Sequence, residues 1–263
     1  MTRRAFSSRR AAEGLAGLSL AAAIACASGG AKKMPSSELY LTERMATVFL
    51  QQGNAMEAEN AYRKVLVDDP DNPEMRDGHG LSLLMLGRPK EAREEFDRAL
   101  KIAPKESYLN NRGVARMELG DYPGAEADFL KAFESPSPAD RQSALINLGR
   151  ARMRRGIFDE AEDAFTRALA LAPDSYEALM ARGEAREARK NEKGAVEDYL
   201  AALRLRADNL DALLHVGMGL MALNNHELGV RYLRRITELS PDSPQASRAR
   251  LILGEGSSAS LPP

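Results

Sequence analysis

The sequence predicts an all-α protein, a solenoid of six helix–turn–helix repeats followed by a capping helix. Two observations lead to this prediction. A pattern of small and aromatic residues at positions i, i+4 and i+7 recurs about every 34 residues. Glycines stand at a fixed distance before five of the six copies of the pattern, and four of the six turns between the helices of a repeat also hold glycine. One helix pair cannot bury its own apolar face, so consecutive pairs should stack.

The second helix of each repeat carries three aligned positions on one helix face. The first position is held by Ala58, Ala92, Ala125, Ala161, Ala195 and Gly229. The second is held by Tyr62, Phe96, Phe129, Phe165, Tyr199 and Leu233. The third is held by Val65, Ala99, Ala132, Ala168, Ala202 and Ile236. Small residues let a neighbouring helix approach, and the aromatic ring fills the space beside them.

The first helix of each repeat carries a small residue at a constant distance before that pattern. These residues are Ala46, Gly80, Gly113, Gly149, Gly183 and Gly217. Glycine should also occupy the turn between the two helices with positive φ, at Gly53, Gly87, Gly120 and Gly156. Lys190 and Asn224 replace it in the fifth and sixth repeats, and the fifth turn in particular should be less ideal.

Two segments depart from the regular repeat. The copies at Ala125 and Ala161 are further apart than the others, and we expect a loop over residues 135–140 to hold the extra residues. After Pro241, residues 246–253 predict a short capping helix that Gly254 ends. The sequence thus predicts a repeat domain over residues 37–253 and a disordered tail over 254–263.

These columns together resemble the tetratricopeptide repeat (TPR) over about residues 37–241. The resemblance implies a right-handed solenoid whose first helices line a concave groove. It also implies that this groove binds segments of other proteins.

The N-terminus predicts an export signal over residues 1–25. Four arginines lie within residues 1–10, and residues 14–25 form a short apolar run. A helix through this run would be about 18 Å long, too short for the roughly 30 Å hydrocarbon core of a bilayer. A basic stretch, a short apolar core and small residues at its end are typical of a signal peptide. The sequence leaves open whether export uses the Sec or the twin-arginine route.

The end of this signal, Ala23-Ile24-Ala25-Cys26, resembles the lipobox of bacterial lipoproteins. The resemblance implies that Cys26 is acylated and becomes the mature N-terminus, with residues 26–36 as a lipidated tether. Ala27 then favours the outer membrane. The alternative is an ordinary cleavage site beside which Cys26 has no role.

Composition and motifs exclude most other classes. The counts of 37 Lys and Arg against 38 Asp and Glu indicate no nucleic-acid partner. The three histidines have no metal-ligand spacing, and no nucleotide-binding, zinc-protease or serine-hydrolase motif occurs. We therefore expect no enzyme activity, metal, cofactor or small-molecule substrate.

The binding groove is predicted from one face of the first helices, beside the glycine column. Methionines are concentrated on this face, and their flexible side chains suit an adaptable apolar binding surface. They would equally suit packing between adjacent first helices, so both interpretations stay open. The candidate groove residues are Asn110, Val114, Met117, Asn147, Arg150, Met153, Met180, Glu184, Leu214, Met218 and Met221.

The combination of lipobox, short tether and six repeats resembles the outer-membrane pilotins of type IV pilus secretins. This resemblance implies a lipid-anchored protein on the periplasmic face of the outer membrane, whose partner is a secretin that it helps to assemble. The alternatives are a periplasmic adaptor that docks peptidoglycan-modifying enzymes, or a general envelope scaffold.

Overall fold

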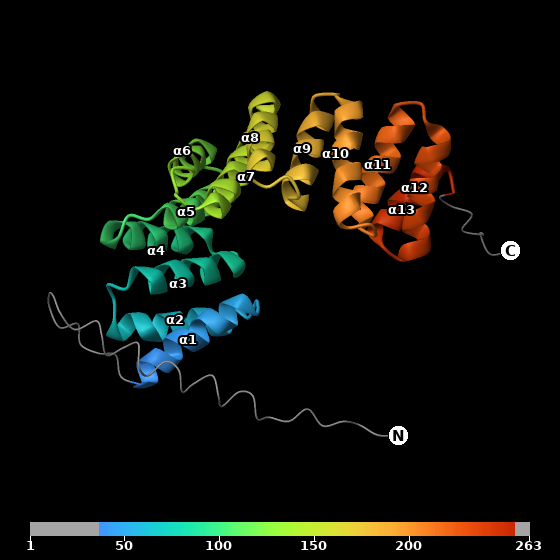
Figure 1. The fold of residues 1–263 in the computed structure, drawn as a ribbon. Helices are drawn as coiled ribbons and strands as arrows, with labels where there is room; N and C mark the ends of the chain where they lie inside the picture. The colour runs from blue at the N-terminus through green and yellow to red at the C-terminus, as the bar shows by residue number, and fades with distance from the viewer. Residues whose placement is uncertain (1–36, 256–263) are drawn as a thin grey trace, which may run out of the picture. The chain divides into compact units, whose positions relative to one another are not determined.

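The computed structural model describes residues 37–255, which form thirteen α-helices and no β-strand (Figure 1). The predicted signal peptide, Cys26, the tether and residues 256–263 lie outside the described residues. The helices form six pairs and a final single helix. They are α1 (Ser37–Gln51), α2 (Ala55–Asp68), α3 (Pro73–Met85), α4 (Pro89–Ile102), α5 (Glu106–Glu118), α6 (Tyr122–Ala132), α7 (Pro138–Arg154), α8 (Phe158–Leu171), α9 (Tyr176–Ala188), α10 (Glu192–Leu205), α11 (Leu210–Ala222), α12 (His226–Leu239) and α13 (Pro244–Leu253).

Stacking in chain order organises these helices. From α2 onward, every helix packs against the next one in the chain. The first helices of neighbouring repeats also touch, as α3 does with α5, α5 with α7, and α7 with α9. The predicted all-α solenoid is therefore confirmed.

The glycine column and the aromatic column meet inside each repeat. A Cβ built on Gly113 of α5 would lie 2.5 Å from a ring carbon of Phe129 of α6. The same 2.5 Å approach joins Gly149 to Phe165. Both rings are completely buried. The constant distance between the two columns in the sequence thus reflects one contact, in which the ring occupies the space that a side chain would need.

The first repeat lacks this contact between a ring and a glycine of the same repeat. Ala46 stands in its glycine column and is completely buried. The ring of Tyr62 reaches the next repeat, where its tip would lie 2.3 Å from a Cβ on Gly78 of α3. The first helix pair is therefore held in part by the second.

The turns within the repeats have the predicted left-handed residue. Gly120 has φ of 78°, and Gly53, Gly87 and Gly156 lie between 70° and 79°. Lys190 and Asn224 take the same conformation with φ of 61°. Each therefore holds the left-handed conformation that a residue with a Cβ rarely adopts.

The prediction of a loop over residues 135–140 is wrong for the C-terminal half of that segment. Helix α7 begins at Pro138 and runs for 17 residues, whereas α5 and α9 have 13 each. The Ser137 side chain accepts a hydrogen bond from the Asp140 N–H at 3.3 Å, and proline suits the first helical position. Some of the extra residues therefore lengthen the first helix of the fourth repeat.

Two repeats contain a buried aspartate held by two arginines, an arrangement not expected from the sequence. Asp128 of α6 is 2% exposed and accepts hydrogen bonds from Arg112 at 2.7 and 2.9 Å. Arg116 donates a further one at 2.9 Å. Asp198 of α10 has the same arrangement with Arg182 and Arg186. Each carboxylate joins the two helices of its repeat, and its charge is matched by two cations.

Helix α13 covers the end of the solenoid, as predicted. Ala246 and Ala249 are completely buried, and α13 packs against α12 and α11. The helix begins at Pro244, slightly earlier than expected, because Ser243 accepts a hydrogen bond from the Ala246 N–H at 3.1 Å. Gly254, with φ of 72°, ends it.

Candidate peptide-binding groove

An open groove of about 1050 Å³ runs along the first helices of the fourth, fifth and sixth repeats. Helices α7, α9 and α11 supply most of its lining, together with the turns that precede α9 and α11. Five of the residues predicted from the sequence meet here, and they are Met117, Arg150, Met153, Met180 and Glu184. The structure thus brings together predicted residues from three adjacent repeats.

Each methionine of the groove contacts both the groove and the hydrophobic core. Met117, Met153 and Met180 line the groove, yet all three are half-buried and pack against the hydrophobic core of the central repeats. The same methionine side chains can therefore pack between first helices and also present an apolar surface to the groove. The thioether ends can adapt to an apolar ligand because Met has three flexible side-chain torsions.

The rim of the groove is charged, which differs from the apolar surface expected from the methionines. Arg150 forms an ion pair with Glu177 at 2.7 Å. The guanidinium of Arg206 lies 4.3 Å from the centre of the Tyr176 ring, a cation–π contact. The other charged lining residues are Arg154, Asp174, Glu184 and Asp211. Cations and anions are both present, so the groove can orient a bound segment by charge.

These rim residues lie outside the face predicted from the sequence, for two reasons. Tyr176, Glu177 and Asp211 lie one helical turn before the predicted face, so extending the face toward the helix N-terminus would have found them. Arg206 lies in the turn between α10 and α11. No helical periodicity identifies a turn residue that folds back over the first helix of its own repeat.

His215 of α11 also lines the groove and belongs to a half-buried polar cluster. Its Nδ1 lies 3.1 Å from a carboxylate oxygen of Glu187, which also accepts a hydrogen bond from the Tyr199 hydroxyl at 2.8 Å. The imidazole stacks on the Tyr199 ring at 4.7 Å. The hydrogen bond to Glu187 raises the pKa of His215 although burial opposes it, and the same bond lowers the pKa of Glu187.

The remaining predicted groove residues lie elsewhere. Asn147 of α7 donates a hydrogen bond to Asn110 of α5 at 3.0 Å, so these two link neighbouring first helices. Val114 lines a smaller hollow beside α3. Leu214 is 5% exposed. The last two, Met218 and Met221, pack against the core of the C-terminal repeats.

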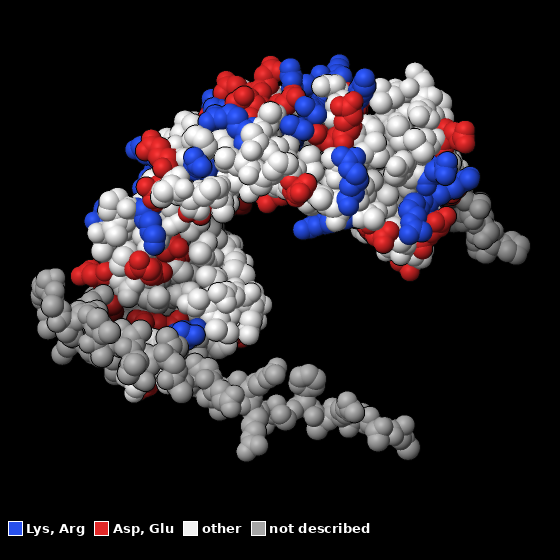
Figure 2. All heavy atoms as spheres, viewed as in Figure 1, with Lys and Arg blue, Asp and Glu red and all other residues white. Residues whose placement is uncertain are grey.

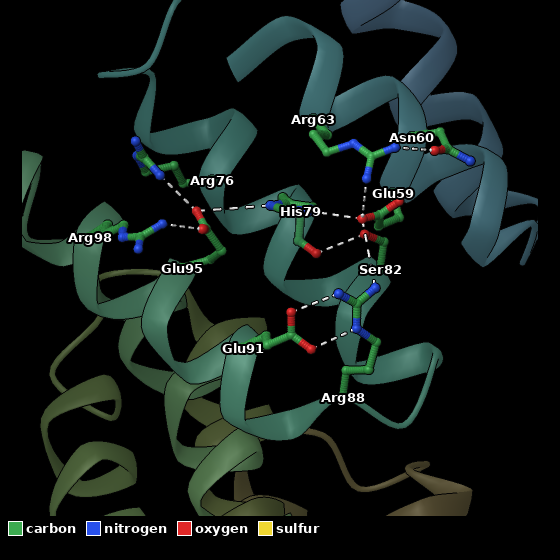
Figure 3. Close-up of polar contacts among 10 residues, drawn as sticks. All are labelled: Glu59, Asn60, Arg63, Arg76, His79, Ser82, Arg88, Glu91, Glu95 and Arg98. Atoms are coloured by element: carbon green, nitrogen blue, oxygen red, sulfur yellow. Dashed lines mark hydrogen bonds and ion pairs between the residues drawn. The ribbon is translucent and has the colours of Figure 1, made fainter. Parts of the chain in front are cut away.

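A second polar cluster lies between α2, α3 and α4 (Figure 3). The His79 ring nitrogens lie 3.7 Å from Glu59 and 3.9 Å from Glu95. Arg76 donates a hydrogen bond to Glu95 at 2.7 Å. Burial alone would raise the pKa of Glu95, but His79, Arg76 and Arg98 around it lower that pKa. These residues join three consecutive helices. They lie outside the candidate groove, which later repeats form.

The surface charge on the viewed face is mixed. Figure 2 shows acidic and basic side chains interspersed over α6 to α10, without a large patch of either sign. Within residues 37–255 no cluster of three metal-binding side chains occurs. No helix in this described part is long and apolar enough to cross a membrane.

The sequence and the fold are similar to those of known proteins. Residues 44–107 and 146–211 match the family model of the tetratricopeptide repeat. The chain superposes on PilW, a widely conserved type IV pilus biogenesis factor, with a TM-score of 0.75 and 21% identity, over 83% of this chain and 100% of PilW. It superposes on PilF of Pseudomonas aeruginosa with a TM-score of 0.70 and 20% identity, over 82% of this chain and 97% of PilF.

A shorter TPR protein with an unusual peptide-binding site, YrrB, superposes with a TM-score of 0.56 and 18% identity, over 74% of this chain and all of YrrB. A comparison with curated protein sequences finds no match. At these identities the superpositions establish the fold. The chain is therefore an all-α solenoid of tetratricopeptide repeats.

Proposed function

We propose that this chain is a lipid-anchored TPR protein of the outer membrane that assists the assembly of a type IV pilus secretin. Cys26 carries the acyl anchor, and the solenoid faces the periplasm. The groove between α7, α9 and α11 captures a segment of the secretin. TPR solenoids are generally binding scaffolds without catalytic activity, and this role requires no catalysis.

The observation that carries the proposal is the extent of the structural match. PilW and PilF are covered over 100% and 97% of their chains, and each covers more than four-fifths of this one. The agreement therefore extends over nearly the whole of both chains rather than one local motif. The lipobox at Ala23–Cys26 adds an anchor that fits a protein acting at a membrane.

The groove suits a segment with apolar anchors and charged flanks. Met117, Met153 and Met180 would accept the apolar side chains. Arg206 and Glu184, both exposed, would pair with opposite charges on the segment and set its direction.

An affinity-capture experiment tests the proposal. The mature lipoprotein, held in mild detergent, is used as bait in an envelope extract. A groove variant carries Glu184→Lys and Arg206→Glu. The control variant carries Glu197→Lys and Arg204→Glu on α10, two exposed positions outside the groove with the same exchange of charges. We expect the wild type and the control to retain a secretin and the groove variant to lose most of it.

Two outcomes would contradict the proposal. Capture of peptidoglycan-modifying enzymes in place of a secretin would favour the adaptor. Equal capture of a secretin by the groove and control variants would move the binding surface away from this groove.

A further inference from the structure

The first helix of the solenoid exposes an apolar stripe. Leu41, Met45 and Val48 are 58%, 52% and 43% exposed, respectively. Their i, i+4, i+7 spacing places them on one face of α1. Ala46, which is completely buried, lies on the opposite side of the helix.

In every later repeat the corresponding face is covered by the preceding repeat. The residue equivalent to Val48 is Ser82 in α3, Ala115 in α5, Ala151 in α7, Ala185 in α9 and Gly219 in α11, and all five are buried. Each of these first helices packs against the second helix before it. A Cβ on Gly219, for example, would lie 2.4 Å from Val196 of α10. Among the described residues, no helix precedes α1.

The stripe on α1 does not have the shape of a surface that receives another repeat. The equivalent of Val48 is always a small residue, because the neighbouring helix approaches most closely there. Val48, in contrast, is branched at Cβ and projects from the helix. Side chains that project in this way can enter a fluid apolar phase without an interlocking partner surface.

We propose that the face formed by Leu41, Met45 and Val48 lies against the lipid surface to which Cys26 is anchored. The inference rests on the proposed acylation of Cys26. Residues 27–36 separate the anchor from α1, and a chain of that length spans at most about 36 Å. The stripe is therefore held close to the bilayer, where a weak apolar contact is sufficient.

The residues around the stripe fit a lipid surface. Tyr40, 44% exposed, has the Arg44 guanidinium 5.9 Å from its ring centre. Tyr and Arg are side chains that reside at the level of lipid headgroups. In the sequence, Lys32 and Lys33 lie between Cys26 and α1, and each basic residue near an anionic surface adds to its attraction.

A second copy of the chain is the weaker occupant. A stable dimer buries roughly 20–30 residues on each side. The stripe and its two flanking side chains fall well short of that number.

The test uses an environment-sensitive dye on the acylated, full-length mature protein in vesicles of phosphatidylethanolamine and phosphatidylglycerol. The thiol of acylated Cys26 is blocked, so the substitution Met45→Cys supplies one reactive thiol. Leu251→Cys on α13, at a position 72% exposed, is the matched control. We expect the dye emission at position 45 to shift to shorter wavelength and to resist quenching by iodide, with neither change at position 251.

The possible failures can be told apart. Intact mass shows whether Cys26 is acylated. A mass without the acyl chains would overturn both the proposed anchor and this inference. An acylated protein whose dye at position 45 behaves like that at position 251 would overturn the inference alone. A shift that needs no vesicles and grows with protein concentration would assign the stripe to a second copy, which also overturns it.

Discussion

At the scale of single residues, the left-handed turn position shows how the repeats tolerate imperfect sequence. Six turns use the same backbone conformation, and four of them use glycine. In the fifth turn the Asn191 N–H still donates to the Arg186 carbonyl at 2.8 Å, as the Asp121 N–H does to the Arg116 carbonyl at 2.9 Å in the third. The surrounding helices therefore impose the turn even where lysine must adopt positive φ.

Replacing the two non-glycine turn residues should stabilise the protein unequally. A side chain in the left-handed region costs about 1–2 kcal/mol, which is partly offset by the greater freedom of glycine in the unfolded chain. Lys190→Gly should therefore raise the free energy of unfolding by about 0.5–1 kcal/mol. Asn224→Gly should gain less, because asparagine adopts this conformation more readily. Urea denaturation measures both, with Gly156→Ala as a destabilised control. A loss of stability in Lys190→Gly would contradict the argument.

The His215–Glu187 pair should make stability depend on pH. The pKa of His215 is raised from 6.5, so its contribution is complete below 6.5 and is lost as pH rises through the higher folded value. The pKa of Glu187 is lowered from 4.5, so its contribution is present above 4.5 and is lost as pH falls through the lower folded value. The pair therefore stabilises most between about pH 4.5 and 6.5.

The variant His215→Phe keeps a ring to stack on Tyr199 but cannot titrate. We expect the wild type to exceed it in unfolding free energy by about 1–2 kcal/mol near pH 5.5, and by less at pH 8. Chemical denaturation at the two pH values makes the comparison. A difference that does not change with pH would show that His215 acts through packing alone.

Individual contacts were predictable from the sequence where they repeat. The approach of Gly113 to Phe129 recurs at one sequence separation in four repeats, so two aligned columns were sufficient to locate it. The Asp128 site, by contrast, recurs fully only at Asp198, although both aspartates stand directly before the aromatic residue of their repeat and Glu95 holds the same position in the second repeat. Charged side chains on a helix are usually solvated, so this column was not recognised as buried although its spacing from the aromatic is constant.

At the scale of helices and turns, each pair depends mainly on its neighbours. Contacts join consecutive helices and adjacent first helices, as expected for a solenoid. Helix order and the capping helix followed from the periodicity. The start of α7 did not, because Pro136 and Pro138 are both compatible with a loop and only the Ser137 cap decides where the helix begins.

Removing α13 should therefore have a local effect. A chain that ends before Pro244 exposes the apolar surface of α12 and α11 that Ala246 and Ala249 cover. We expect amide hydrogen exchange to accelerate in α11 and α12 and to stay unchanged in α5 to α8. Exchange followed by mass spectrometry measures this. Equal acceleration in all repeats would mean that the solenoid unfolds as one cooperative unit.

At the scale of the whole solenoid, the groove arises from the way three repeats stack. The sequence located the methionines that line it, but not its charged rim, because Arg206 follows the end of α10 and lies over Tyr176 of α9, a contact that no helical spacing predicts. The position of the groove along the chain also depends on how the repeats stack. Met218 lies on the same predicted face as Met153, and both pack against the core, but Met153 lines the groove and Met218 does not.

The central claim is that this groove holds a secretin segment, and site-specific photocrosslinking in intact piliated cells tests it most directly. A photoreactive amino acid replaces Glu184 inside the groove or Glu197 outside it. We predict an adduct between the chain and a secretin subunit from position 184 and none from position 197. An adduct of equal yield from both positions, or adducts only with peptidoglycan-modifying enzymes, would contradict the account.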